Sequence, residues 1–288
     1  MDQLLRIEVF LPVPDVDRAE AFFAQYCAHG WEEAPAPQGA EGVLFRLYLD
    51  DLPAAEEMLL ALRRAFPAAV ASRQSVERED WASAWKEFFT PVLCGDRFVV
   101  LPPWLAHEAP AGRIPIIIEP KTAFGTGHHA TTALCLTALD RLEGRGLLHR
   151  KLSFLDLGTG SGILGLACCL LGMVGLGVDV DPLAVANARE NKRLNGVGDS
   201  FAVGVGSVAG LARSRFGLIL ANILAGPLKV MAPAVVRRLD RSGSLVLSGI
   251  LAEQAEAVTQ AYMAQGLPEP EVMTRDEWVA LIWPPRVT

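Results

Sequence analysis

The chain has 288 residues, of which 51% are hydrophobic and 20% are charged. This length and composition predict one large or two ordinary globular domains with a full core. The formal net charge of −7 argues against direct recognition of nucleic acid, which usually requires a basic surface. Five cysteines without C-x-x-C spacing predict buried thiols in a reducing compartment and no zinc site.

No membrane contact is expected. The N-terminus lacks a basic region followed by a long apolar core, so a signal peptide is not predicted. The uncharged stretch from Leu157 to Val178 is long enough to span a bilayer, but it contains seven glycines and is bracketed by Asp156 and Asp179. A loop, a buried helix and a buried strand explain it better. We expect a cytoplasmic monomer.

Residues 1–75 are predicted to form a small α+β domain. Strand, helix, strand, helix and strand are expected in turn at Leu4–Leu11, Asp15–Ala28, Gly42–Tyr48, Pro53–Phe66 and Ala68–Gln74, with a further short strand near Trp31. This order is typical of a ferredoxin-like fold. No residue here stands in a catalytic pattern, so the domain is interpreted as a binding or structural module.

Residues 76–112 are interpreted as a linker that contains a short helix. The helix, Glu77–Phe89, carries Trp81 and Trp85 four residues apart, which places both indoles on one face. We expect them to pack the junction between two domains. The following segment, Val99–Pro115, contains four prolines and is predicted to be an extended connector.

Residues 113–288 alternate between helices and strands. Helices are expected at Thr131–Leu142, Ile163–Leu171, Pro182–Leu194, Leu228–Leu239 and Ala252–Ala264, and strands at 152–155, 174–178, 201–205, 216–221, 244–249, 270–274 and 277–283. Only Arg275 and Asp276 join the last two strands, which is too short for a parallel crossover, so this pair must be antiparallel. The pattern predicts a doubly wound sheet that ends in an antiparallel hairpin.

The most informative stretch is the glycine-rich turn from Asp156 to Gly162. A turn with Gly158 and Gly160 between a strand and a helix lets a ligand approach the backbone closely. Asp179 ends the next strand, where a carboxylate can hold the two hydroxyls of a ribose. The segment Gly160–Gly165 also satisfies G-x-G-x-x-G, so a dinucleotide is an alternative. Asp156 beside the turn favours S-adenosylmethionine, because a carboxylate suits an amino group and a sulfonium and repels a pyrophosphate.

Two further segments carry side chains suited to a substrate. Ile118–Thr132 places Phe124, glycines, hydroxyls, His128 and His129 just before a helix that Thr131 or Thr132 could cap. The two imidazoles are interpreted mainly as local hydrogen-bonding groups that shape this loop. Asn222 ends the fourth strand of the sheet, at the edge where open α/β sheets bind ligands. Its side-chain oxygen can accept a hydrogen bond from an amine.

These segments resemble one family, the bacterial methyltransferases of large-subunit ribosomal protein L11. The resemblance rests on Phe124-Gly-Thr-Gly-His-His129, Asp156–Gly162, Asn222–Leu228 and Ser248–Leu251, together with Trp81-x-x-x-Trp85. It spans roughly residues 77 to 288, and within the first domain only the order of elements agrees. It implies a class I methyltransferase fold with a seven-stranded sheet, S-adenosylmethionine as the methyl donor, and ribosomal protein L11 as the substrate. It also implies that the first domain docks this substrate, and that lysine ε-amines and the N-terminal α-amine receive several methyl groups each.

The resemblance also implies roles for residues. The family's cofactor contacts fall on Thr132, Gly158, Asp179 and Asn222, with Thr126 and Gly127 adjacent, and the motifs themselves add Asp156, Gly160 and Ser207 as cofactor-binding positions. Many related enzymes carry an acidic residue after the third strand, whereas this chain has Gly206 and Ser207, so Ser207 or the backbone must contact adenine. The catalytic candidates are Asn222 to orient the amine, Phe124 to face the cation, and His128 or His129 as a proton acceptor.

Alternatives stay open at this point. A class I methyltransferase acting on another protein, on RNA or on a small-molecule amine would keep the same cofactor residues. A cofactor-binding module without catalysis would keep Asp156 and Asp179 and tolerate replacement of Asn222. A dedicated base is not required, because a desolvated lysine near a sulfonium has a lowered pKa and bulk water can take the proton.

Overall fold

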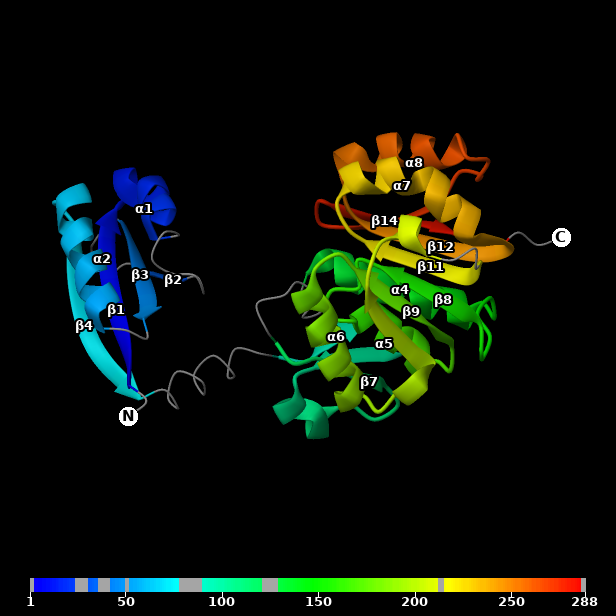
Figure 1. Ribbon diagram of the computed structural model, residues 1–288, viewed down its shortest axis with the longest axis horizontal. Helices are drawn as coiled ribbons and strands as arrows, with labels where there is room; N and C mark the ends of the chain where they lie inside the picture. Colours follow the sequence, from blue (N-terminus) through cyan, green and yellow to red (C-terminus); the bar gives the residue numbers. More distant parts are fainter. Residues whose placement is uncertain are drawn as a thin grey trace. The chain divides into compact units, whose positions relative to one another are not determined.

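The computed structural model describes residues 3–23, 31–35, 42–49, 52–77, 90–120, 129–211 and 215–285. The chain folds into two compact units, Met1–Phe89 and Thr90–Thr288 (Figure 1). Trp81 and Trp85, which were predicted to pack a junction between domains, lie outside the described residues.

The first unit is a four-stranded antiparallel sheet with two helices. Its strands are β1 (Gln3–Pro12), β2 (Trp31–Pro35), β3 (Gly42–Leu49) and β4 (Val70–Glu77), and they lie in the order β2-β3-β1-β4. Its helices are α1 (Val16–Phe23) and α2 (Leu52–Ala65). The order of elements and strands confirms the predicted ferredoxin-like fold.

The spacing of hydrophobic residues explains how the strands and helices of this unit form a core. Ile7, Val9 and Leu11 alternate along β1 and are fully buried, as a strand with one covered face requires. Met58 and Leu62 lie four residues apart on α2 and pack into the same core. The first helix differs from the prediction at its start, because Val13–Asp15 form a 3-10 turn before α1.

The second unit begins with a small sheet where a connector was predicted. Strands β5 (Val92–Cys94), β6 (Phe98–Leu101) and β7 (Ile114–Ile117) lie in the order β5-β6-β7, and a 3-10 helix (Pro103–Glu108) joins the last two. The extended connector predicted for residues 99–115 is therefore wrong. Prolines misled the prediction, because they are tolerated in an edge strand such as β7 and in the first turn of a helix.

The main sheet of the second unit has seven strands. They are β8 (Ser153–Leu157), β9 (Val174–Asp179), β10 (Phe201–Val205), β11 (Phe216–Asn222), β12 (Leu239–Leu251), β13 (Glu271–Arg275) and β14 (Trp278–Trp283). The order is β10-β9-β8-β11-β12-β14-β13, with parallel pairs except where β14 meets β12 and β13. The predicted doubly wound sheet with an antiparallel final hairpin is confirmed.

Five helices accompany this sheet. They are α4 (Ala130–Gly144), α5 (Ile163–Leu170), α6 (Pro182–Leu194), α7 (Ala225–Arg238) and α8 (Ala255–Met263). Helices α7 and α8 pack with one face of the sheet, and α4 and α5 pack with the other (Figure 1). The helix predicted from Ala252 starts instead as a 3-10 turn, Ala252–Gln254.

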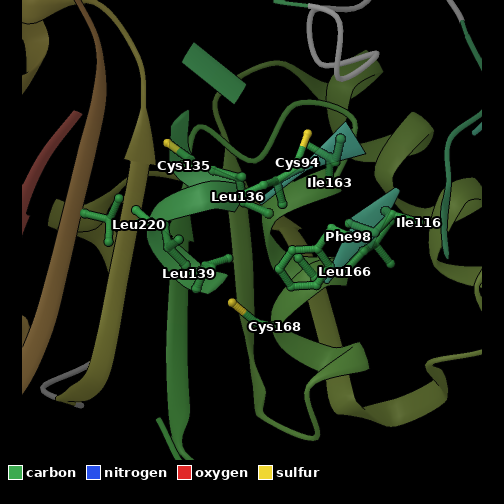
Figure 2. Close-up of a cluster of buried hydrophobic side chains, with 14 of the residues drawn as sticks. Cys94, Phe98, Ile116, Cys135, Leu136, Leu139, Ile163, Leu166, Cys168 and Leu220 are labelled. Carbon is green, nitrogen blue, oxygen red and sulfur yellow. The ribbon is translucent and has the colours of Figure 1, made fainter. Parts of the chain in front are cut away.

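One core cluster joins the small sheet to the helices that border the glycine-rich turn. Figure 2 shows Phe98 and Ile116 of the small sheet gathered with Leu139 of α4 and Leu166 of α5. The described cysteines, Cys94, Cys135, Cys168 and Cys169, are buried free thiols as predicted. This packing fixes the start of α5, and with it the glycine-rich turn, against the rest of the unit.

Candidate functional site

A cavity of about 760 Å³ opens at the carboxyl ends of the parallel strands of the main sheet. The sequence-predicted residues Gly158, Gly160, Asp179, Ser207 and Asn222 all line it, together with His129. Thr132 and Asp156 are buried behind the lining, each 1% exposed. Phe124, Thr126, Gly127 and His128 lie outside the described residues. The sheet thus brings together Gly158 and Asn222, which are 64 positions apart in sequence, because β8 and β11 both end at this edge.

The glycine-rich turn is held against the neighbouring strand by its backbone. Gly158, Gly160 and Gly162 all have positive φ angles, of 67°, 55° and 85°, a conformation that side chains disfavour. The N–H groups of Gly158 and Thr159 donate to the carbonyl of Val178 at 2.9 and 3.1 Å. Gly162 then caps α5 in the left-handed conformation. The turn presents backbone without side chains to the cavity.

Asp179 orders the loops on both sides of it. Its Oδ2 accepts from the N–H of Gly160 at 2.9 Å, and its Oδ1 accepts from the N–H of Asp181 at 3.0 Å. The carboxylate is half-buried and lines the cavity, so lone pairs on both oxygens stay available to a ligand. The site therefore holds a fixed acceptor of the kind that binds a ribose diol.

Asp156 supports the turn from below. Its Oδ2 accepts from Thr159 Oγ1 at 2.6 Å and from the N–H of Gly165 at 3.0 Å. Burial raises the pKa of this carboxyl to about 6, although the hydrogen bonds from Thr159 and Gly165 oppose the change. The carboxylate was predicted to face a ligand, but it is absent from the cavity lining and instead ties the turn to the first turn of α5.

The wall beyond Asp179 is mostly apolar. Val178, Val180, Val208 and Met231 line it, and Ser207 is the first polar side chain after β10. The N–H of Gly206 donates to the carbonyl of Asp179 at 2.8 Å, which fixes the chain next to Ser207. A flat aromatic heterocycle suits such a wall, because apolar side chains can cover its faces while the backbone and Ser207 meet its edge.

Asn222 stands on the other side of the turn. Its Nδ2 donates to Thr132 Oγ1 at 3.2 Å, and its Oδ1 accepts no hydrogen bond from the described residues. The next residue, Ile223, packs closely against Gly158 and Gly249, which both have positive φ angles. A Cβ at Gly158 would overlap the Cγ2 atom of Ile223, and a Cβ at Gly249 would overlap its carbonyl group. The hydrogen bond to Thr132 and the close packing of Ile223 orient the side chain of Asn222, so its oxygen is available as a hydrogen-bond acceptor in the cavity.

An aromatic pair completes the cavity beside Asn222. The rings of His129 and Trp278 meet edge to face, with centroids 4.9 Å apart. His129, not a threonine, is the N-cap of α4: its Nδ1 lies 2.8 Å from Thr131 Oγ1 and accepts from the N–H of Thr131 at 3.4 Å. The interpretation of His129 as a local hydrogen-bonding group is confirmed.

Sequence reasoning missed Trp278, although a topological argument could have found it. Because β14 runs antiparallel to its neighbour β12, its first residue lies at the edge where the parallel strands end. Trp278 pairs with Leu251, two residues past Gly249 of the cavity lining. An aromatic residue at the start of the final strand was therefore a candidate for this edge.

Among the described residues, no group of three or more histidine, cysteine, aspartate or glutamate side chains is arranged to hold a metal ion. No helix in the described part of the chain is long and apolar enough to cross a membrane.

Comparisons with known proteins agree on one family. The family model for ribosomal protein L11 methyltransferase (PrmA) matches residues 47–284. A ribosomal protein L11 methyltransferase of Chromohalobacter salexigens is 40% identical over 259 residues, which is 87% of this chain and 84% of that relative. One of Trichlorobacter lovleyi is 40% identical over 230 residues, 77% of this chain and 73% of the relative. A crystal structure of ribosomal protein L11 methylase from Lactobacillus delbrueckii subsp. bulgaricus aligns with a TM-score of 0.61 and 29% identity, covering 67% of this chain and 97% of that one.

Proposed function

The chain belongs to the ribosomal protein L11 methyltransferase family, and we propose that it transfers methyl groups from S-adenosylmethionine to amines of ribosomal protein L11. The observation that carries this function is the convergence of the glycine-rich turn, Asp179 and Asn222 on one cavity. A nucleoside-binding half and an amine-binding half then lie side by side, as transfer between two substrates requires.

The residues present fit S-adenosylmethionine. Asp179 would accept from its ribose hydroxyls, and the wall formed by Val180, Ser207 and Val208 would cover its adenine. The bare backbone of Gly158 and Gly160 in the cavity lining admits its amino-acid end, and a Cβ at Gly158 would overlap Ile223. Asp156 and Thr132 lie outside the cavity lining. Asp156 fixes the glycine-rich turn through Thr159, and Thr132 fixes the side chain of Asn222. When bound, this cofactor supplies an electrophilic methyl group on a sulfonium.

The acceptor must arrive as a neutral amine. A protonated amine has no lone pair, and free lysine has a pKa of about 10.4. Transfer into the largely apolar cavity disfavours the charged form and lowers that pKa. Asn222 Oδ1 would accept one N–H of the neutral amine and direct its lone pair. Bulk water takes the proton that is lost on entry, so no side chain has to act as the base.

Trp278 supplies the aromatic face on the acceptor side. The methylated product is a cation, and an indole face attracts cations and tolerates each added methyl group. The sequence had suggested Phe124 for this role; Phe124 lies outside the described residues, and Trp278 lines the cavity. We assign the methylated groups as lysine ε-amines and the N-terminal α-amine, with Trp278 beside the amine that reacts.

The first unit is assigned to docking of the protein substrate. It has its own core and a ferredoxin-like sheet, and the cavity residues all belong to the second unit. Cross-linking of the full chain to ribosomal protein L11, read by mass spectrometry, tests this assignment. Cross-links are expected within residues 3–77; cross-links confined to residues 90–285 would contradict it.

Steady-state kinetics of Asn222→Ala test the proposed chemistry. Loss of the oriented acceptor should lower kcat by roughly a hundredfold, as removal of a positioning hydrogen bond typically does. The KM for ribosomal protein L11 should stay within about twofold, because docking involves a different unit. Unchanged kcat would remove Asn222 from the reaction and favour a binding module without catalysis.

A further inference from the structure

Asn191 of helix α6 and Asn195, the C-cap of that helix, take the place of a missing strand beside β7. On one edge, β7 pairs with β6, and the N–H of Ile118 continues this pairing by donating to Leu101. On the opposite edge, the side chain of Asn195 accepts from the N–H of Ile117 at 2.8 Å and donates to its carbonyl at 2.6 Å. Buried backbone groups need partners, and a side-chain amide supplies both here.

Asn191 makes the same kind of contact one turn earlier on α6 and adds a second one. Its Oδ1 accepts from the N–H of Glu119 at 2.9 Å. Its Nδ2 donates to the carbonyl of Ser161 at 2.9 Å and lies 3.4 Å from Asn187 Oδ1. Asn191 is 0% exposed, so water cannot replace either contact.

These two contacts join the glycine-rich turn to the chain segment that leads, in sequence, toward His129. Ser161 stands between Gly160 and Gly162 in the turn that lines the cavity, and it is 1% exposed. Glu119 is the residue from which the chain continues, in sequence, toward Phe124 and then to His129 at the cavity wall. A single planar amide therefore fixes the spacing between the cofactor-side turn and the start of the acceptor-side segment.

We propose that Asn191 is a positioning residue for methyl transfer, which couples the cofactor-binding turn at Ser161 to the acceptor-side chain at Glu119. The inference rests on the proposed function in one respect, that the cofactor binds at the glycine-rich turn. Asn191 lies outside the cavity lining, so it acts through Ser161 and Glu119 and not by contact with either substrate.

Asn191→Asp separates the two contacts. The variant keeps an oxygen for the N–H of Glu119, but it sets a second carboxylate oxygen against the carbonyl oxygen of Ser161. The glycine-rich turn should lose its hydrogen bond at Ser161, while Glu119 keeps its hydrogen bond to residue 191. Calorimetry with S-adenosylmethionine should show affinity weakened about tenfold or more, because a buried hydrogen bond is replaced by a repulsion. At saturating cofactor, kcat should stay within about threefold of the wild type.

Asn195→Asp is the matched control. It makes the same substitution four residues along the chain, where the amide contacts Ile117 and the carbonyl of Asn191 but no residue of the glycine-rich turn. Thermal stability should fall in both variants, yet cofactor affinity should change by less than about twofold in Asn195→Asp. Equal losses of affinity in the two variants would reduce Asn191 to a structural residue and overturn the proposal.

Asn191→Ala tests the coupling itself and serves if Asn191→Asp does not fold. Loss of both contacts should weaken cofactor binding and also lower kcat at saturating cofactor by about tenfold, since the N–H of Glu119 loses its partner. Wild-type kcat in this variant would refute the coupling. Because the binding measurement uses no acceptor, a wild-type chain that binds S-adenosylmethionine but leaves ribosomal protein L11 unmodified would defeat the proposed substrate and not this inference.

Discussion

The buried carboxylate of Asp156 should make the stability of the second unit depend on pH in a defined direction. Raising the pKa of this group from its ordinary value of 3.8 to about 6 corresponds to roughly 3 kcal/mol of preference for the protonated form. Between these two values the folded state holds a proton that the unfolded state has released. The stability contributed by this proton is complete below pH 3.8 and is lost as the pH rises through 6.

Asp156→Asn isolates the effect. A single oxygen, Oδ2, accepts both hydrogen bonds, from Thr159 and from Gly165, so an amide oxygen in its place keeps both. The added NH₂ group needs an acceptor, and its cost of about 1–3 kcal/mol is the same at every pH. Relative to the variant, the wild type should therefore lose about 2 kcal/mol of unfolding free energy between about pH 4.5 and 7.5.

Urea unfolding of the ligand-free protein at several pH values measures this difference. The unfolding transition whose urea midpoint shifts in Asp156→Asn reports the second unit. The size of that shift gives the difference in unfolding free energy between the variant and the wild type. A carbon-13 titration of labelled aspartate carboxyls supplies an independent check, since the resonance absent from Asp156→Asn should titrate near pH 6. Parallel stability curves, or a midpoint near 4, would refute the argument that burial dominates this group.

Three other substitutions probe the cavity. Asp179→Asn should weaken binding of S-adenosylmethionine by roughly ten- to a hundredfold in calorimetry, because hydrogen bonds to a charged acceptor are lost; affinity within twofold of the wild type would exclude a ribose contact. Gly158→Ala should weaken it at least about tenfold, since the methyl group overlaps Ile223. Its control, Gly196→Ala, has a similar φ of 63° but open space around it, so it should lose stability and keep its affinity. Trp278→Ala should lower kcat by roughly two- to tenfold and leave cofactor affinity unchanged; an unchanged kcat would place the acceptor elsewhere.

The strand directions of the second unit follow from local rules applied to the sequence. The two residues predicted to join the last strands, Arg275 and Asp276, are too few to cross over a sheet, so the final pair had to be a hairpin. The antiparallel pairing of Glu271–Arg275 with Trp278–Trp283 confirms it, with Asp276 and Glu277 as the connection. Alternation of helices and apolar strands before it required parallel pairing. The small sheet escaped prediction because its strands are short and Pro115 lies on an edge strand, where a missing N–H costs little.

The site was predictable in its positions and less so in its contacts. The glycine-rich turn pointed to Asp156 and Asp179, but a motif does not say which way a carboxylate points. Asp156 turns inward to Thr159 and Gly165, and Asp179 lies in the cavity lining. Trp278 reaches the cavity through the antiparallel pairing of β14 with β12, and Asn191 contacts the glycine-rich turn from outside the lining, so no local pattern marks either of them.

The most direct test of the whole account is intact-mass spectrometry of purified ribosomal protein L11 after incubation with the full chain and S-adenosylmethionine. The account predicts mass gains in whole methyl units, several per molecule, that disappear when Asn222→Ala replaces the wild type. An unmodified substrate, with cofactor binding to the wild type shown by calorimetry, would contradict the assignment of ribosomal protein L11 as the acceptor.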